Sequence, residues 1–181
     1  VANVADIFAA LSAQALPFVA GFMVDGDAVK AAQAIGTGNR GVVPMGAMRD
    51  GAPFSPEVTV ERVGIVEYRN EGPNLHGELL EGGLGAVVRV GEHGHIAIVT
   101  ERIQAYDTQA FRSQGIGLEE KAIIHVKSSN HFRSAFTPLA ENGVFVVDSG
   151  GWASTDARRF PFTKRATRIL PLAKLDRAEW D

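Results

Sequence analysis

Two kinds of hydrophobic spacing mark the beginning of the chain. Apolar residues recur at helical intervals over residues 4–14, which predicts a helix, and a continuous apolar run over residues 17–24 predicts a buried strand. Asp25, Gly26 and Asp27 then form a turn that supplies an N-cap. A second short helix is predicted for residues 28–35, closed by Gly36.

The middle third of the chain favours strands because apolar and polar positions alternate. The predicted strands cover residues 58–65, 75–80, 86–90 and 96–101, with a hairpin turn at residues 91–94. The step from Val60 to Val63 breaks the period of two, which predicts a β-bulge near Glu61 and Arg62. This region therefore indicates an antiparallel meander. The preceding Gly/Pro-rich stretch, residues 36–56, shows little periodicity and leaves two alternatives open, a short strand near Val42 or a functional loop.

A different order of elements follows the meander. The pattern predicts a helical turn at residues 108–114, a buried strand at 122–127, a helix at 129–141 and a second buried strand at 144–148. Strand, helix and strand in this order predict a βαβ unit. The expected fold class is therefore α/β with a mixed sheet, an antiparallel strand meander plus a C-terminal βαβ unit, in a single domain covering residues 1–181.

Charge sets the last 30 residues apart. Residues 152–181 carry seven basic and four acidic side chains, for a net charge of +3, which leaves −6 on the first 151 residues. We expect this segment to be an extended tail docked on an acidic surface. The whole chain has a formal charge of −3, which argues against a nucleic-acid partner.

Composition excludes further classes of protein and site. The 181 residues include no Cys, which excludes a disulfide framework, thiol nucleophiles and Cys-ligated metals. No apolar run is long enough to cross a membrane, so no membrane partner and a cytoplasmic location are expected. Because Val1 is not Met and helical spacing begins almost at once, we also expect the chain to be cut from a longer one.

Several short motifs have ordinary structural interpretations. Residues 36–41 match G-x-G-x-x-G, but the motif follows a predicted helix instead of a strand, which argues against dinucleotide binding. Residues 148–151, Asp-Ser-Gly-Gly, are interpreted as a turn after a strand. His93 and His95 favour solvated turn histidines over a metal site, and His76 and His125 favour hydrogen-bonded structural roles. No catalytic residue and no metal ligand is assigned.

The strongest site signal lies where a predicted strand meets a predicted helix. Free backbone N–H groups at such a helix start, together with an ammonium and hydroxyls, are typical of a site for a carboxylate or a phosphate. The alternative is a helix capped by its own serines beside a solvated lysine. The candidate anion-binding residues are Lys127, Ser128, Ser129, Asn130, His131 and Arg133.

The same residues carry a resemblance to a known family. The chain is similar to the C-terminal domain of the MlrC family, the microcystin-degradation-type metallopeptidases, and the run Lys-Ser-x-x-His-Phe-Arg-x-Ala-Phe-x-Pro is the most specific part. The likeness covers essentially the whole chain and rests on Gln104 to Arg112, Gly115-Ile116, Val126 to Ser128, His131 to Arg133, Ala135-Phe136, Pro138 to Ala140, Val147-Asp148 and Arg168 to Leu172. Two loops depart from the family pattern, at residues 46–51 and 149–151.

The resemblance implies a larger protein. In that protein an N-terminal domain, absent from these residues, would hold a catalytic zinc ion and hydrolyse an amide bond. This chain would be its substrate-shaping and stabilising partner domain, with no cofactor of its own and with a small-molecule or peptide substrate nearby. Two alternatives remain, a stand-alone module that binds small anions and a hydrolase that uses Ser128 or Ser129 with His131.

Overall fold

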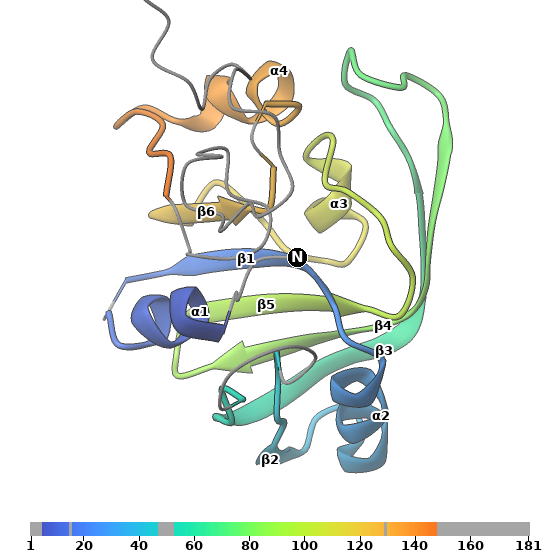
Figure 1. Ribbon diagram of the computed structural model, residues 1–181, viewed down its shortest axis with the longest axis vertical. Helices are drawn as coiled ribbons and strands as arrows, with labels where there is room; N and C mark the ends of the chain where they lie inside the picture. The colour runs from blue at the N-terminus through green and yellow to red at the C-terminus, as the bar shows by residue number, and fades with distance from the viewer. Residues whose placement is uncertain (1–4, 15, 47–52, 129, 148–181) are drawn as a thin grey trace, which may run out of the picture. The chain divides into compact units, whose positions relative to one another are not determined.

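A six-stranded mixed sheet organises the part of the chain that the computed structural model describes, which is residues 5–14, 16–46, 53–128 and 130–147. The strand order is β2-β3-β4-β5-β1-β6 (Figure 1). The strands are β1 (Phe18–Val24), β2 (Arg40–Val42), β3 (Glu57–Arg69), β4 (Leu79–Val90), β5 (Gly94–Val99) and β6 (Ile123–Val126). The mixed α/β class predicted from the sequence is confirmed.

The kind of strand pairing changes once across the sheet, from antiparallel to parallel at β5. Strands β2 to β5 pair in antiparallel fashion, as the predicted meander requires, whereas β1 pairs in parallel with both β5 and β6. Six of the seven residues of β1 are buried, which agrees with its continuous apolar sequence, because a central strand is covered on both faces. Strand β1 is therefore an interior strand of the sheet, with β5 on one side and the edge strand β6 on the other.

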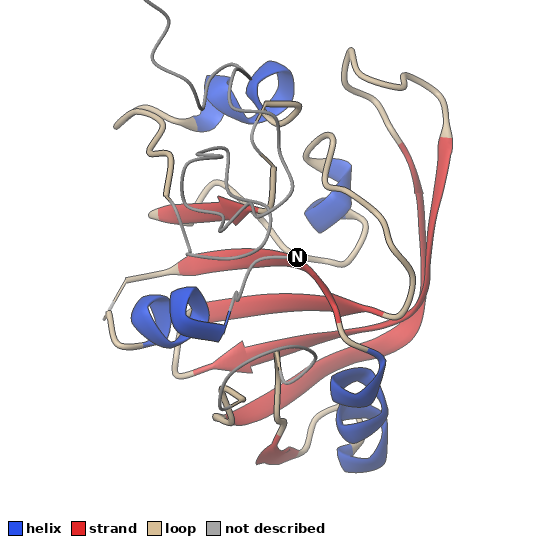
Figure 2. Ribbon diagram, viewed as in Figure 1, coloured by secondary structure: helices blue, strands red, loops and turns tan. Residues whose placement is uncertain are grey.

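Helices cover both faces of the sheet (Figure 2). They are α1 (Ala5–Ser12), α2 (Gly26–Ile35), α3 (Gln109–Arg112) and α4 (Arg133–Phe136), followed by a 3₁₀ turn at Thr137–Leu139. Side chains of α1 and α2 share one core with Phe18 and Ala20 of β1, and side chains of α3 and α4 share a second core with Val19. Because neighbouring residues of a strand point to opposite faces, the two cores lie on opposite sides of the sheet.

Local sequence explains the helix that follows β1. Asp25 is the N-cap of α2, and its Oδ1 accepts a hydrogen bond of 3.0 Å from the backbone N–H of Ala28. Its Oδ2 accepts a second bond of 2.9 Å from Gly46, which ties the 43–46 segment to the helix start. Gly36 ends the helix with φ of 82°. The predicted N-cap turn and the closing glycine are both confirmed.

Strands β3 and β4 form the longest hairpin. They extend past the end of β5 as a two-stranded ribbon (Figure 1). The register shifts between Val60 and Arg62, which confirms the predicted bulge. The prediction of two separate strands at residues 75–80 and 86–90 is wrong. Residues 79–90 are one strand, and Leu75, with φ of 54°, belongs to the preceding turn.

The region after β6 differs most from the prediction. The expected helix over residues 129–141 is reduced to α4 and the 3₁₀ turn, since Pro138 has no backbone N–H to continue an α-helix. Residues 144–147 form no strand, and Phe145 is 82% exposed. The expected βαβ unit is therefore absent from the described residues. Strand β6 pairs with β1, far earlier in the sequence, and is partly buried instead of fully buried.

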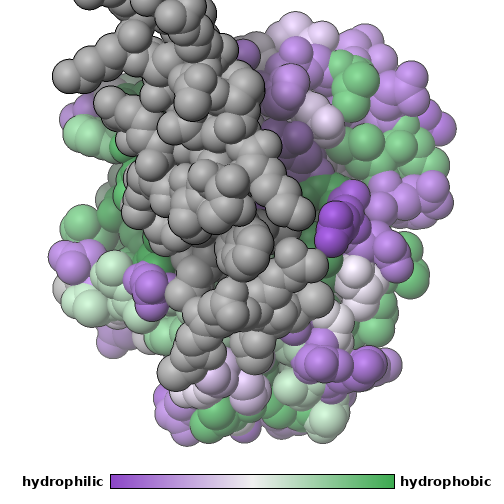
Figure 3. Space-filling model, in the orientation of Figure 1, coloured by the Kyte–Doolittle hydropathy of each residue, from purple (hydrophilic) through white to green (hydrophobic). Residues whose placement is uncertain are grey.

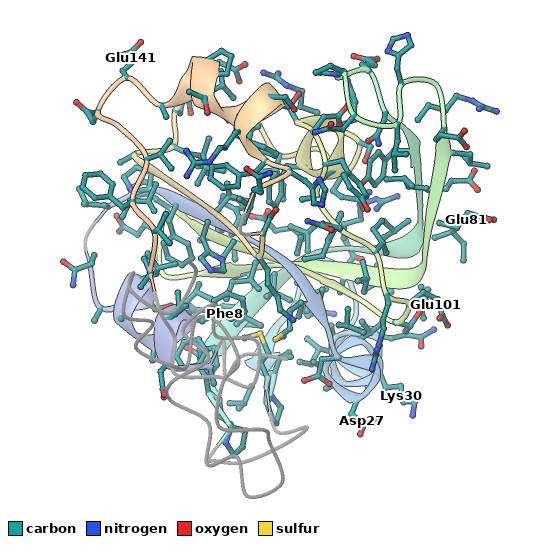
Figure 4. All side chains as sticks on the ribbon, turned by 45° about the horizontal axis from the view of Figure 1, so that its top comes forward. Phe8, Asp27, Lys30, Glu81, Glu101 and Glu141 are labelled. Carbon is teal, nitrogen blue, oxygen red and sulfur yellow. The ribbon has the colours of Figure 1, made fainter. Side chains whose placement is uncertain are left out.

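The outer surface mixes polar and apolar side chains. The face in Figure 3 shows both kinds interleaved among the described residues. In Figure 4 the labelled Phe8 lies among core side chains, whereas Glu81, Glu101 and Glu141 lie at the outside. No helix among the described residues is long and apolar enough to span a membrane. The predicted tail, residues 152–181, lies outside the described residues.

Candidate functional site

The chain leaves β6 through Lys127 and Ser128, the first two candidate anion-binding residues. At the start of this loop, the backbone N–H of Ser128 donates a hydrogen bond of 3.0 Å to the carbonyl of Val126. The Ser128 hydroxyl accepts a hydrogen bond of 2.9 Å from Nε2 of Gln104, and the Gln104 carbonyl accepts one of 3.2 Å from the hydroxyl of Tyr68. These bonds join β3, the segment after β5 and the loop that follows β6.

Beside this network, the charges of Lys127 and Arg102 influence each other. Partial burial of the otherwise exposed Lys127 side chain is the main cause that lowers its pKa, and the charge of Arg102 lowers it further. Among the described residues, neither of these two side chains forms an ion pair or a hydrogen bond. Both residues are exposed, so an anion from solvent has access to the two positive charges. We refer to Lys127 and Arg102 as the cation pair.

The remaining candidates lie on a second group of contacts. The Asn74 side-chain amide, in the β3–β4 turn, donates to the His131 carbonyl and to the Ser134 hydroxyl, each at 2.8 Å. The His131 ring packs edge-on against Tyr106 with 5.6 Å between ring centres. Asn130 and Arg133 are exposed, and the Arg133 guanidinium lies 5.2 Å above the ring of Phe132. This group links the ribbon to α4.

The helix start differs from the one on which the predicted anion site rests. Helix α4 begins at Arg133, four residues later than predicted, and has only four residues. The Arg133 N–H is bonded to the Asn130 carbonyl, and the Ala135 N–H to the Phe132 carbonyl. These N–H groups are therefore not free to hold a ligand. Ser129, at which the helix was expected to begin, lies outside the described residues.

The structure thus divides the predicted set. Lys127 and Ser128 lie at the end of β6, whereas Asn130, His131 and Arg133 belong to the α4 segment. No hydrogen bond or ion pair among the described residues joins the two groups. Arg102 and Gln104 were missed as site residues, because only the parallel pairing of β6 brings the 102–104 segment beside Lys127. Gln104 did figure in the family resemblance, which was the only signal for it.

Histidine positions change two of the sequence interpretations. His93 is exposed in the turn, as expected, but His95 lies on β5 in a polar cluster. Its Nε2 is 3.2 Å from Oε2 of Glu61 and its Nδ1 is 2.9 Å from Nζ of Lys121. Burial is the main cause that lowers the pKa of His95, with the Lys121 charge next. The interpretation of His95 as a solvated turn histidine is therefore wrong.

The other histidines are structural, though not alike. His76 lies in the β3–β4 turn, with Nδ1 3.0 Å from the Glu71 carbonyl oxygen. His125 packs edge-on against Phe8, and its buried Nδ1 has no hydrogen-bond partner, contrary to the expected hydrogen-bonded role. Within the described residues, no three His, Asp or Glu side chains are placed to hold a metal ion.

The glycine motif at residues 36–41 is a tight turn. The Gly38 N–H donates to the Val60 carbonyl at 2.8 Å, and the motif leads into β2. A dinucleotide phosphate would meet no helix N-terminus here, which agrees with the sequence interpretation. The Asp-Ser-Gly-Gly motif at 148–151 lies outside the described residues.

Comparison with known proteins supports the family resemblance. One solved structure with this fold is from Mesorhizobium sp. BNC1 and is named a "putative metallopeptidase". It matches with a TM-score of 0.80 and 22% identity over 96% of this chain, which corresponds to 35% of that chain. No curated protein matches significantly. The family described as MlrC C-terminus matches residues 1–164. This chain belongs to the MlrC C-terminus family.

Proposed function

We propose that this chain is the substrate-shaping and stabilising C-terminal domain of an MlrC-like zinc-dependent amide hydrolase. Family membership over residues 1–164 supports this proposal, and so does a metallopeptidase-named neighbour with the same fold. The chain spans about a third of the length of that neighbour. We propose that its partner is an N-terminal catalytic domain of the larger enzyme. We also propose that the enzyme is cytoplasmic.

The zinc ion is assigned to the other part of the enzyme. The described residues offer no group of three His, Asp or Glu ligands, so they do not fit a catalytic zinc site. In the proposal, this chain contributes charge and shape and is not catalytic alone.

The feature that carries the proposal is the cation pair, whose two residues are exposed and lie next to the hydrogen-bonded residues Gln104 and Ser128. Lys127 and Arg102 would hold a carboxylate of a small-molecule or peptide substrate, since a guanidinium and an ammonium both donate charged hydrogen bonds to such a group. Gln104 holds the Ser128 hydroxyl at 2.9 Å and so fixes the loop that carries Lys127. A role for Ser128 as a nucleophile with His131 finds no support, because the described residues show no contact between them.

A stand-alone module that binds small anions is the second candidate. It rests on the same cation pair, and needs no other domain. The Asn130, His131 and Arg133 side chains remain candidate ligand-binding residues in both proposals, because all three are exposed.

Substitution of Lys127 separates the two candidates. Lys127→Ala and Arg102→Ala should each lower kcat/KM of the full-length enzyme for a carboxylate-bearing amide by about tenfold, since one charged hydrogen bond contributes on the order of 1.5–3 kcal/mol. Lys30→Ala is the matched control, because Lys30 is an exposed lysine paired with Asp27 on α2. Amidase kinetics and acetate binding, measured by calorimetry, give the readouts.

Each outcome has a distinct meaning. Unchanged kinetics with weakened acetate binding would favour the anion module over the hydrolase domain. Unchanged kinetics and unchanged binding in both variants would contradict any role of the cation pair.

A further inference from the structure

Three consecutive apolar side chains near the end of the described chain, at residues 145–147, are exposed to solvent. Phe145, Val146 and Val147 are 82%, 76% and 68% exposed. Single exposed apolar residues are ordinary, whereas a contiguous apolar patch marks an interaction surface. These residues follow α4 and its 3₁₀ turn, beyond the outward-pointing Glu141 labelled in Figure 4.

The backbone of this segment is unpaired as well. None of the residues 144–147 forms a backbone hydrogen bond to another described residue. Valine and phenylalanine favour extended structure, and neighbouring side chains of an extended chain point to opposite sides. Because all three side chains are exposed, cover is needed on both sides. The composition of residues 144–147 is therefore typical of a strand that is covered on both faces, yet no described strand pairs with them.

The segment is anchored at one end. Val144 packs against the second core, as do Ile124 and Val126 of β6. Strand β6 is itself the last strand in the described sheet, and three of its four residues are apolar yet only partly buried. Two apolar segments thus contact the same core, β6 with one neighbouring strand and residues 144–147 with none among the described residues.

We propose that residues 144–147 form an interface strand that packs against the remaining part of the larger hydrolase. This inference rests on the proposed function for the existence of that part. The solved neighbour matches 96% of this chain with only 35% of its own length, so most of that polypeptide lies outside the shared fold. The segment carries no charge, which fits a permanent apolar interface better than a transient polar one.

Hydrogen exchange tests the proposal directly. The backbone amides of residues 144–147 should exchange about a hundredfold more slowly in the full-length enzyme than in the 181-residue chain, because pairing within a sheet protects amides. Equal exchange in the two proteins would overturn the proposal. Protection already present in the 181-residue chain would also overturn it, and would assign the cover to residues 148–181 or, if it depends on concentration, to a second copy.

A double variant adds an independent readout. Phe145→Ser with Val147→Ser should lower the thermal midpoint of the full-length enzyme and leave that of the 181-residue chain unchanged. Ile65→Ser is the matched control, because Ile65 is 61% exposed on β3. An equal effect of the double variant in both proteins would contradict the proposal. Amidase activity is read separately, so an inactive enzyme with protected 144–147 amides would refute the function and leave the interface standing.

Discussion

The ring of His125 places a polar nitrogen inside the domain without a hydrogen-bond partner. It packs edge-on against Phe8 at 5.8 Å between ring centres, and its Nδ1 has no hydrogen-bond partner. Burial, with a smaller contribution from the Lys127 charge, lowers the pKa of His125 from 6.5 to about 4. The folded protein therefore keeps this histidine neutral at pH values at which the unfolded chain protonates it.

Stability should consequently fall in acid. Between pH 6.5 and about 4 the unfolded state binds the additional proton, so the free energy of unfolding decreases as the pH falls through this window and this contribution levels off below it. A shift of this size corresponds to about 3 kcal/mol. Urea denaturation at several pH values measures the loss.

The variant His125→Phe isolates this contribution. It should be less sensitive to pH between 6.5 and 4 than the unaltered chain, because it keeps an aromatic ring against Phe8 and does not titrate. His93→Gln replaces an exposed turn histidine and is the control. Parallel pH profiles for His125→Phe and the unaltered chain would show that the histidine is not the source of the acid sensitivity.

At the scale of elements, close packing fixes how β1 lies beside β5. Gly94 at the start of β5 pairs with Phe18 at the start of β1, and Phe18 is 2% exposed. A Cβ atom at position 94 would lie 2.3 Å from Cε1 of the Phe18 ring. A glycine is therefore required for the parallel pairing of these two strands, although the sequence places it in a hairpin turn.

Gly94→Ala should destabilise the domain by about 1–3 kcal/mol, because the phenylalanine ring must leave its position in a packed core. Gly64→Ala on β3 is the matched control, since a Cβ there meets only the Arg62 side chain, at 3.8 Å. Thermal unfolding of both variants checks the difference. If the thermal unfolding midpoints of Gly94→Ala and Gly64→Ala were equal, the Phe18 ring could move to admit the new methyl group without loss of stability, contrary to the prediction.

At the scale of the whole molecule, the described residues build two cores and no metal centre. The two cores cover opposite faces of one sheet, and polar clusters such as the one around His95 are filled by Glu61, Arg89 and Lys121. Basic side chains in such a cluster oppose the binding of a cation.

The purified 181-residue chain should therefore bind less than one zinc ion per chain. Elemental analysis after dialysis checks this, with the full-length enzyme measured alongside. One tightly held zinc ion in the 181-residue chain would contradict the assignment of the metal to another domain. Zinc in neither protein would contradict the zinc-dependent mechanism itself.

The sequence by itself determined those features that depend on only a few neighbouring residues, such as helix ends and a β-bulge. Asp25 and Gly36 bound α2 because a cap needs only the neighbouring backbone, and the bulge at Glu61 follows from a break in a two-residue period. The class of the fold and the family were also evident, since the strand meander and the run from Lys127 to Pro138 are contiguous.

Only the tertiary structure decided which distant segments meet. The four apolar residues 144–147 have the composition of a buried strand, but a strand needs a partner, and β6 instead pairs with β1 about a hundred residues earlier. The same pairing places Arg102 and Gln104 beside Lys127 and Ser128, far from where the helix start was expected. Strand pairing and charge proximity depend on contacts across the chain, so no local pattern of residues specifies them.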